Sequence, residues 1–212
     1  MYKRQVLGII PERLVNCALV HGIHMEKVGK ADCGRGAQDF TSAIPACDGL
    51  YTNEKNVPLG LNYADCTPLL FYDAVTSSIA VAHGGWRGTA GNIAGEAVRH
   101  LQESYGAEPK NIKAGIGPAI GKSVFEVEKD VVEAFEKIFD EEEMRRLSAP
   151  KGEGKILIDL PLANRILIER AGILPENIED CGICTYCRND LFYSYRKAAG
   201  RTGRHMAVMM LK

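Results

Sequence analysis

The sequence contains no long hydrophobic run, no large excess of charge of either sign, and no repeated or low-complexity segment. No apolar stretch approaches the roughly 20 residues that a helix needs to cross a bilayer, so we expect no membrane partner. The basic first residues are not followed by the hydrophobic region and cleavage site of a signal peptide. The cytoplasm is therefore the expected location.

Positive and negative side chains are almost balanced. Lysine and arginine total 26 against 27 for aspartate and glutamate, which gives a formal net charge of -1. A chain so close to neutrality has no general electrostatic attraction for nucleic acid, so we expect no nucleic-acid partner. The seven cysteines are an odd number without a secretion signal, which favours reduced thiols over a disulfide framework.

Short apolar segments alternate with segments of helical periodicity along the whole chain. Strands are predicted at 17–20, 57–63, 69–72, 78–83, 113–116, 156–158, 178–185 and 206–211, and helices at 89–105, 129–147 and 160–171. The charged stretch 141–155, which contains a proline and two glycines, is the best candidate for a mobile loop. The interleaved pattern predicts one domain over residues 1–212, an α/β or α+β sandwich with a mixed sheet flanked by helices.

Three residues that can bind metals stand where predicted strands end or meet. His21 and His83 each follow a predicted strand and precede a glycine, and Cys66 lies between two predicted strands. Taken singly, each has a structural explanation, because a lone cysteine usually behaves as a small buried hydrophobe. Together they supply two imidazoles and a thiolate, and a catalytic zinc uses three protein ligands with an open fourth position. His24 is a nearby competing candidate.

The residues after His83 are typical of a turn that binds a ligand. Gly84 and Gly85 let the backbone approach a ligand closely. The helix predicted to follow could receive an anion at its start, where Arg87 adds positive charge. The structural alternative is a tight turn with Trp86 packed in the core.

Two segments near the C-terminus each have two interpretations. Cys181, Cys184 and Cys187 have the spacing of structural zinc sites, but no fourth ligand is evident nearby, so reduced, packed cysteines are favoured. The segment 192–204 combines aromatic residues, arginines and glycines, which could bind a base and a phosphate. Without further context, a strand edge followed by a basic turn is the favoured interpretation.

Taken in order, these motifs resemble the family variously named laccase-domain, multicopper polyphenol oxidase or purine nucleoside phosphorylase proteins, which includes a bacterial peptidoglycan editing factor. The blocks are VHG at 20–22, ADCTPLLF at 64–71, AHGGWRG at 82–88, GPAIG at 117–121, FEV at 125–127, CT at 184–185, FYSYR at 192–196 and TGR at 202–204. Two features depart from the family pattern. Leu19 stands where glutamine is usual, and the family's N-terminal stretch with a Ser-x-Arg-x-Gly-Gly-type loop is expected to be absent.

The resemblance implies a zinc enzyme of purine nucleoside chemistry with a fold related to cysteine-hydrolase-like proteins. Its implied zinc ligands are His21, Cys66 and His83. Its implied reactions are phosphorolysis of adenosine, inosine, guanosine or methylthioadenosine and deamination of adenosine, so the partners would be purine nucleosides and inorganic phosphate. Copper is less favoured than zinc, because the sequence offers no complete ligand set for several coppers. The oligomeric state is left open.

Several roles at such a site have alternatives. Cys66 is either a metal-bound thiolate or a covalent nucleophile with His83 as its base. Asp65 either carries a proton or orients a ligand. Arg87, Arg196 and the turn at 84–85 are predicted to hold the phosphate and the substrate. The competing functions are a cysteine-dependent hydrolase or amidase acting on peptidoglycan precursors, a copper-dependent polyphenol oxidase, and a nucleoside-binding module without turnover.

Overall fold

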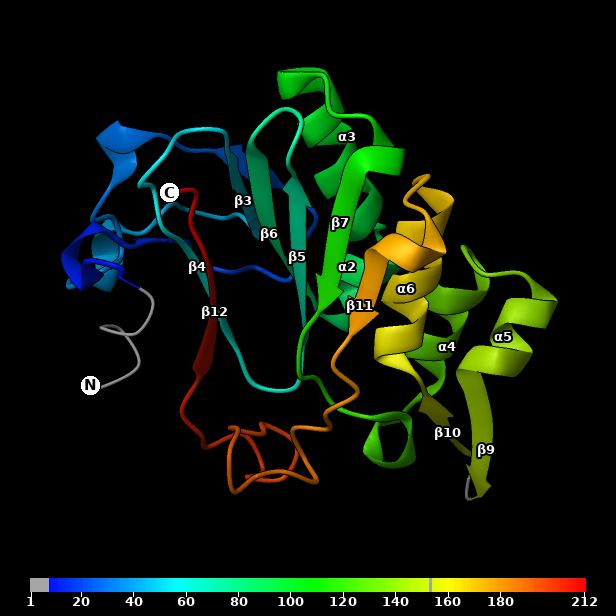
Figure 1. The fold of residues 1–212 in the computed structure, drawn as a ribbon. Coiled ribbons are helices and arrows are strands. Elements are labelled where there is room, and N and C mark those ends of the chain that lie inside the picture. The colour runs from blue at the N-terminus through cyan, green and yellow to red at the C-terminus, as the bar shows by residue number, and fades with distance from the viewer. Residues whose placement is uncertain (1–7, 153) are drawn as a thin grey trace.

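The large mixed sheet forms the middle layer of a sandwich in a computed structural model that describes residues 8–152 and 154–212 (Figure 1). In spatial order its strands are β11 (Ile178–Asp180), β7 (Ile112–Ile116), β5 (Thr67–Asp73), β6 (Ser78–Gly84), β3 (Gly49–Thr52) and β2 (Met25–Lys27). The two outermost pairs are parallel and the inner pairs are antiparallel. This confirms the predicted mixed sheet.

Two smaller sheets accompany it. The first contains β1 (Val15–Asn16), β4 (Leu59–Tyr63) and β12 (His205–Met209), and the second contains β8 (Glu126–Val127), β10 (Lys155–Ile158) and β9 (Ser148–Gly152). The helices are α2 (Trp86–Ala90), α3 (Ile93–Tyr105), α4 (Lys129–Glu136), α5 (Glu141–Leu147) and α6 (Leu160–Arg170). Within the described residues, no helix is long and apolar enough to cross a membrane.

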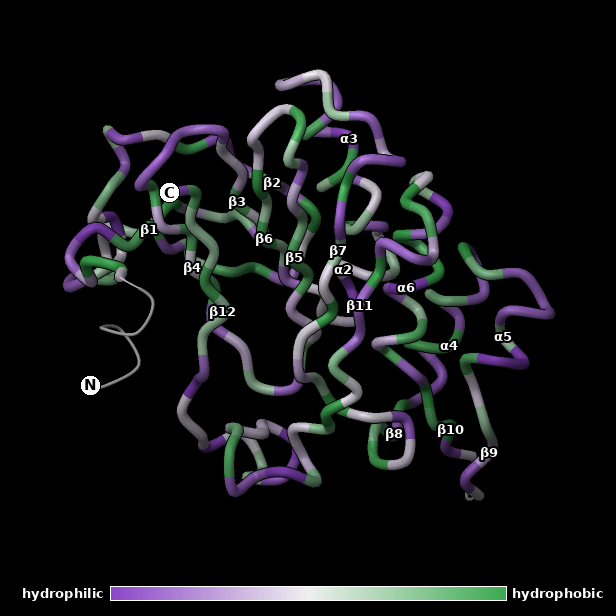
Figure 2. The backbone as a smooth tube through the Cα atoms, viewed as in Figure 1, coloured by the Kyte–Doolittle hydropathy of each residue, from purple (hydrophilic) through white to green (hydrophobic). Residues whose placement is uncertain are grey.

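Strand β6 separates two hydrophobic cores because its side chains alternate between the faces of the sheet. Ala80 and Ala82 pack against the helices α3 and α6. Ile79 and Val81 face the sheet β1-β4-β12 instead. Figure 2 shows hydrophobic segments along the strands of both sheets and hydrophilic segments in the outer loops. The result is the predicted α/β sandwich; its relation to cysteine-hydrolase-like folds stays a prediction.

Two predicted helices are each broken in two. The helix expected at 89–105 is interrupted before α3, where Asn92 adopts a left-handed backbone (φ 64°) and its side chain accepts a hydrogen bond from Gly95 N. The helix expected at 129–147 stops after α4, and Asp140 and Glu143 form a capping box that starts α5. Helical periodicity continues across both breaks, so the capping side chains decide where each helix begins.

Other expectations need correction. The mobile loop predicted at 141–155 is instead α5 followed by the β9–β10 hairpin, apart from residue 153, which lies outside the described residues. Of the strand predicted at 17–20, only a single bridge at Cys17 is formed, directly after β1. The strand predicted at 178–185 ends at Asp180. Strands β1, β2, β3 and β8 were not predicted, because each is short and pairs with a segment distant in the sequence. Strand β9 was not predicted either, because its segment was expected to be a loop.

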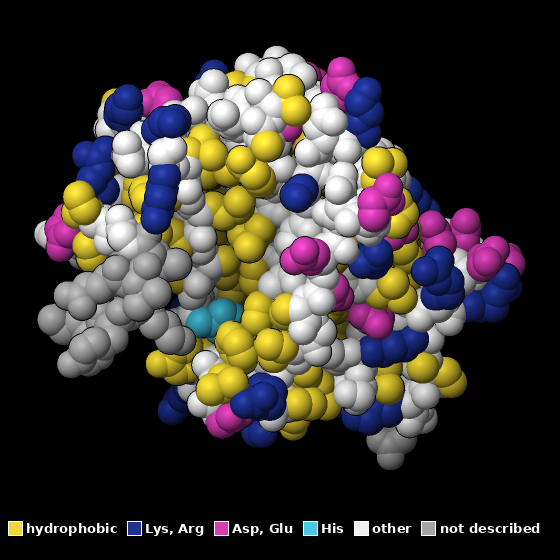
Figure 3. All heavy atoms as spheres, in the orientation of Figure 1, with side chains coloured by type: hydrophobic (Ala, Val, Ile, Leu, Met, Phe, Trp, Pro, Cys, Tyr) yellow, Lys and Arg dark blue, Asp and Glu magenta, His cyan; other side chains and the backbone are white. Residues whose placement is uncertain are grey.

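Part of the large sheet is left uncovered, because the three-stranded sheet is narrower. Figure 3 shows hydrophobic side chains in a hollow on this face, among dispersed charges of both signs. Leu70, Tyr72 and Met209 line a shallow cavity of about 250 Å³ there, and Tyr72 remains 38% exposed. The candidate site lies elsewhere, at the end of the sheet where β6 runs into α2.

Candidate metal centre

The side chains of His21, Cys66 and His83 converge, with their ligating atoms all within 4.8 Å of one another. Strands β5 and β6 pair so that Thr67 lies opposite Gly84, which places Cys66 beside the end of β6. The rings of His21 and His83 meet edge to face, with centroids 5.0 Å apart. His83 is only 3% exposed, whereas Cys66 is half-buried and His21 is exposed. The site therefore has one face open to solvent.

Asp48, which the sequence analysis missed, holds this arrangement together. Its carboxylate accepts hydrogen bonds from the backbone N–H of His21 (2.8 Å) and Gly22 (2.7 Å), which fixes the loop in which His21 has a left-handed backbone (φ 60°). Asp48 Oδ1 also lies 3.5 Å from His83 Nδ1. That contact leaves Nε2 as the ring nitrogen free to bind a metal. The only signal of Asp48 in the sequence was its position as a charged residue directly before a short apolar run.

The electrostatics of the cluster favour a thiolate. Burial raises the pKa of the Cys66 thiol, but hydrogen bonds with His21 and His83 outweigh burial and bring the pKa to about 6. Burial lowers the pKa of His83, while Asp48 and Cys66 raise it to about 9. The thiolate is both the metal-binding form of cysteine and its nucleophilic form. Geometry and charge thus permit either of the two roles predicted for Cys66.

Gly85 leaves the space that the three side chains require. A Cβ atom at this position would lie 3.2 Å from Cys66 Sγ, 3.3 Å from His21 Cδ2 and 3.5 Å from His83 Cε1. Gly84 differs, because its Cβ would point at Thr67 O (2.9 Å). The predicted substrate contacts at Gly84 and Gly85 stay predictions. Helix α2, which follows the turn, has only five residues, and anion binding at its start stays a prediction.

A cavity of about 670 Å³ opens above the three candidate ligands. Its polar lining consists of the candidate ligands and the side chains of Asn62, Asp65, Arg87, Arg196 and Arg204. Its apolar and aromatic lining includes Leu19, Phe40, Trp86, Ile120, Phe125, Leu160 and Tyr195. The structure thus brings together all the predicted side chains of the site, which come from four separate segments. A cavity of this size and character suits a small organic ligand with a few polar groups.

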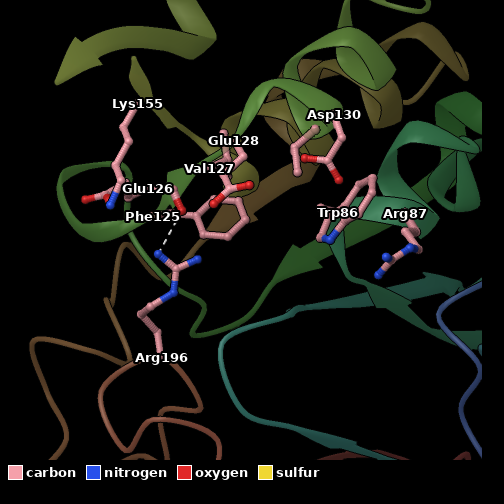
Figure 4. Close-up of a pocket in the computed structure, with 10 residues that line it drawn as sticks. Trp86, Arg87, Phe125, Glu126, Val127, Glu128, Asp130, Lys155 and Arg196 are labelled. Atoms are coloured by element: carbon pink, nitrogen blue, oxygen red, sulfur yellow. Dashed lines mark hydrogen bonds and ion pairs between the residues drawn. The ribbon is translucent and has the colours of Figure 1, made fainter. Parts of the chain in front are cut away.

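Two predicted arginines occupy the wall between this cavity and a second one of about 420 Å³ (Figure 4). The Arg87 guanidinium stacks 4.2 Å from the Trp86 ring centroid. Among the described residues, it makes no hydrogen bond or ion pair. Arg196 differs, because its Nη1 donates to Glu126 O (2.8 Å) and its guanidinium lies over Phe125. Arg87 therefore has all its donors available for a ligand, whereas Arg196 has one of its donors engaged by Glu126.

Asp65 connects the C-terminal segment to the loop before Cys66. Its buried carboxylate accepts hydrogen bonds from Thr185 Oγ1 (2.6 Å), Ser194 Oγ (3.0 Å) and Arg196 N (2.7 Å). Asp65 itself has a left-handed backbone (φ 86°). Both carboxylate oxygens are thus occupied by donors from the segment that carries Arg196. This arrangement favours positioning over proton transfer, the two roles that the sequence left open.

The remaining candidates lie away from the cluster or differ from expectation. His24 is exposed and contacts Glu26 (3.1 Å), so it does not compete as a ligand. Of the three C-terminal cysteines, Cys181 and Cys187 are exposed and only Cys184 is half-buried, so the expectation of packed cysteines fails for two of them. The segment 192–204 forms turns and contains no strand edge.

Comparison with known proteins agrees with these motifs. The family described as multi-copper polyphenol oxidoreductase laccase matches residues 2–212. The purine nucleoside phosphorylase YlmD of Bacillus subtilis is 38% identical over 192 residues, which are 91% of this chain and 68% of that protein. The Geobacillus stearothermophilus YlmD is 41% identical over 200 residues, 93% of this chain and 72% of that protein.

Two further similarities extend the comparison. Adenosine deaminase RL5 from an unknown prokaryotic organism is 32% identical over 198 residues, 93% of this chain and 75% of that protein. The crystal structure of the hypothetical protein YfiH of Bacillus licheniformis superposes with a TM-score of 0.94 at 36% identity and covers 99% of this chain and 78% of that one. Sequence and fold therefore agree over the same residues.

Proposed function

Because this chain belongs to the multi-copper polyphenol oxidoreductase laccase family, and because its relatives include purine nucleoside phosphorylases and an adenosine deaminase, we propose that it is a zinc-dependent enzyme of purine nucleosides. It would cleave purine nucleosides with inorganic phosphate and also deaminate adenosine. We further propose that residues 1–212 act as a single domain. The shared core of the large sheet and its helices supports this.

The observation that carries the proposal is the convergence of His21, Cys66 and His83 at the floor of one cavity. Two imidazoles and a thiolate with an open fourth direction are a donor set that suits catalytic zinc. The space kept by Gly85 fits a metal between the three side chains. Among the described residues this is the one group of three such ligands, which does not provide for several coppers.

The chain's own residues supply positioning and charge. When bound, zinc would contribute a Lewis acid that lowers the pKa of a water and stabilises developing negative charge. Asp48 holds the ring of His83 through Nδ1 and the loop of His21 through its backbone. The aromatic rings of Phe125 and Tyr195 line the cavity and offer surfaces on which a purine can stack.

Arg87 is the proposed phosphate ligand. Its guanidinium has free donors and a fixed position on Trp86, and such forks bind phosphate oxygens in pairs. In phosphorolysis a phosphate oxygen would bond to the ribose anomeric carbon while the bond to the purine nitrogen breaks, and the purine leaves with the electron pair and takes up a proton. In deamination water adds at the purine amino carbon and ammonia leaves. Only the first reaction requires Arg87.

The test combines metal analysis with product analysis. Purified protein is analysed for zinc and copper and incubated with adenosine, with and without phosphate. We expect about one zinc per chain, adenine and ribose 1-phosphate only with phosphate, and inosine in both cases. Removal of zinc with a chelator should abolish all products, and added zinc should restore them.

His21→Ala and His24→Ala form a matched pair for this experiment. Both replace an exposed histidine, but only His21 belongs to the cluster. We expect His21→Ala to lose zinc and turnover, and His24→Ala to keep both. Metal-free protein that turns over adenosine at the full rate would rule the proposal out.

A cysteine-dependent hydrolase is the second candidate, and a specific geometry favours it. Cys66, His83 and Asp48 form a chain of contacts with the order nucleophile, base and orienting carboxylate. Such an enzyme would cleave amide bonds, as in peptidoglycan precursors, through a thioester at Cys66. It would remain active after chelation, which separates it from the zinc enzyme; alkylation of Cys66 would inactivate both.

A further inference from the structure

The pair Cys184 and Cys187 has no part in the proposed chemistry, and neither residue lines the cavity. The two follow the C-x-x-C spacing in a turn after β11. Cys184 Sγ accepts hydrogen bonds from two backbone donors, Gly121 N at 3.3 Å and Cys187 N at 3.4 Å. The thiols of Cys184 and Cys187 also influence each other electrostatically. One sulfur is half-buried among donors and the other is exposed.

The two thiols are electrostatically different. Burial raises the pKa of Cys184, but the N–H groups of Cys187, Gly121 and Tyr186 outweigh burial and lower it. The hydrogen bond with Cys184 raises the pKa of Cys187. A thiolate held by backbone donors beside a protonated partner thiol is the arrangement of reactive C-x-x-C pairs.

A structural metal site explains the same residues less well. Structural zinc takes four protein ligands. Among the described residues, no third histidine, cysteine or carboxylate joins Cys184 and Cys187 in a cluster of ligating atoms. Cys181, three residues earlier, is exposed and stands outside such a group. Two ligands on a surface turn do not make a stable zinc site.

We propose that Cys184 and Cys187 form a redox-active dithiol that exchanges with small disulfides at the protein surface. The Cys184 thiolate attacks one sulfur of a low-molecular-weight disulfide, forms a mixed disulfide and releases one thiolate. Cys187 then loses its proton to solvent, and its sulfur attacks Cys184 Sγ and releases the second thiolate. Two protein thiols are oxidised to a disulfide, and the small disulfide is reduced to two thiols.

The turn that contains this pair is joined to the loop of the candidate metal centre. Thr185, between the two cysteines, donates to the carboxylate of Asp65 (2.6 Å), the residue before Cys66. On the other side, Lys197 Nζ donates to Tyr186 O (3.3 Å), next to the cavity residue Arg196. The dithiol turn is therefore one hydrogen bond away from two segments that line the cavity, the one with Asp65 and the one with Arg196.

The experiment uses the full chain in mixtures of reduced and oxidised glutathione. After equilibration the reaction is quenched with acid, free thiols are alkylated, and intact mass and peptide mass are measured. We expect one intramolecular disulfide between Cys184 and Cys187, seen as two thiols protected from alkylation. The readout involves no nucleoside and no catalysis, so its failure would leave the proposed function untouched.

Cys187→Ser and Cys181→Ser are the matched variants, because both replace exposed thiols in the same segment. Cys181→Ser should form the disulfide like the parent protein. Cys187→Ser should instead retain one glutathione on Cys184 as a stable mixed disulfide. The proposal is wrong if the parent protein stays reduced in every mixture, if Cys187→Ser still forms an internal disulfide in this segment, or if stoichiometric zinc protects both thiols.

Discussion

Asp48 Oδ1 lies 3.5 Å from Nδ1 of His83, and both side chains are almost completely buried. The same carboxylate accepts the backbone N–H of His21. One aspartate thus orients two of the three candidate ligands, one through its ring and one through its loop. Carboxylates in this position usually fix the ring of a metal-binding histidine and strengthen it as a ligand.

Asp48→Asn should weaken zinc binding about 10- to 100-fold, the range found when a supporting carboxylate is removed. The amide keeps the size of the side chain but places an N–H group against backbone donors or against His83. Competition with a chromogenic chelator measures the affinity. Asp73→Asn is the control, because Asp73 is also fully buried but hydrogen-bonds only to its own turn at 75–76. Unchanged affinity in Asp48→Asn would contradict the assigned role.

Gly85→Ala should lower zinc affinity about tenfold or more, a loss of at least ~1.4 kcal/mol. The backbone of Gly85 (φ -73°) suits alanine, so the effect would come from the new methyl group, which would meet Cys66 Sγ at 3.2 Å. Isothermal titration with zinc measures it. Gly115→Ala serves for comparison, because its methyl group would meet only Leu70 at an ordinary 3.7 Å. Equal affinities in the two variants would show that the space at Gly85 is not needed.

Arg87→Ala should raise the KM for phosphate about 10- to 100-fold, since hydrogen bonds to charged groups contribute about 1.5–3 kcal/mol. Phosphate-independent deamination of adenosine should change little, which makes the same variant its own control. Initial rates at varied phosphate concentration measure both. Arg99→Ala, which removes a surface arginine paired with Glu96 and Glu103, should leave both reactions unchanged. A parallel loss of deamination would place Arg87 in a different role.

Asp65→Asn should lower the free energy of unfolding by about 1–3 kcal/mol, because buried donors from Thr185, Ser194 and Arg196 lose their charged acceptor. Urea unfolding measures this change. Thr185→Val removes one of the three donors and should cost less. If Asp65 instead carries a proton, Asp65→Asn would lower kcat sharply while stability stays at the parent value, so the two measurements decide between the roles.

Some elements follow from local sequence alone. The apolar run at 78–83 and the periodic segment at 160–171 agree with β6 and α6 to within one residue at each end. Their side chains have the period of the element that they form, and burial of one face then stabilises it. The breaks at Asn92 and Asp140 did not follow, because a capping hydrogen bond depends on one side chain and leaves the hydrophobic period unchanged.

The candidate site was only partly predictable. Ordered motifs pointed to His21, Cys66 and His83, and to Arg87 and Arg196 nearby. Asp48 left almost no trace, because a single aspartate before an apolar run is common and its partners are more than twenty residues away. Gly84 and Gly85 looked equivalent in sequence. Their roles differ because successive residues in an extended chain point to opposite faces.

The sequence by itself determined which residues can bind a metal, which segments are buried, and the family to which the chain belongs. These depend on residue type and on local periodicity. Only the tertiary structure decided that β5 and β6 are neighbours, that Asp48 ties the loop of His21 to His83, and that Asp65 brings Arg196 to the cavity. The physical reason is that strand order and long-range hydrogen bonds are set by the packing of whole layers, which no short stretch of sequence contains.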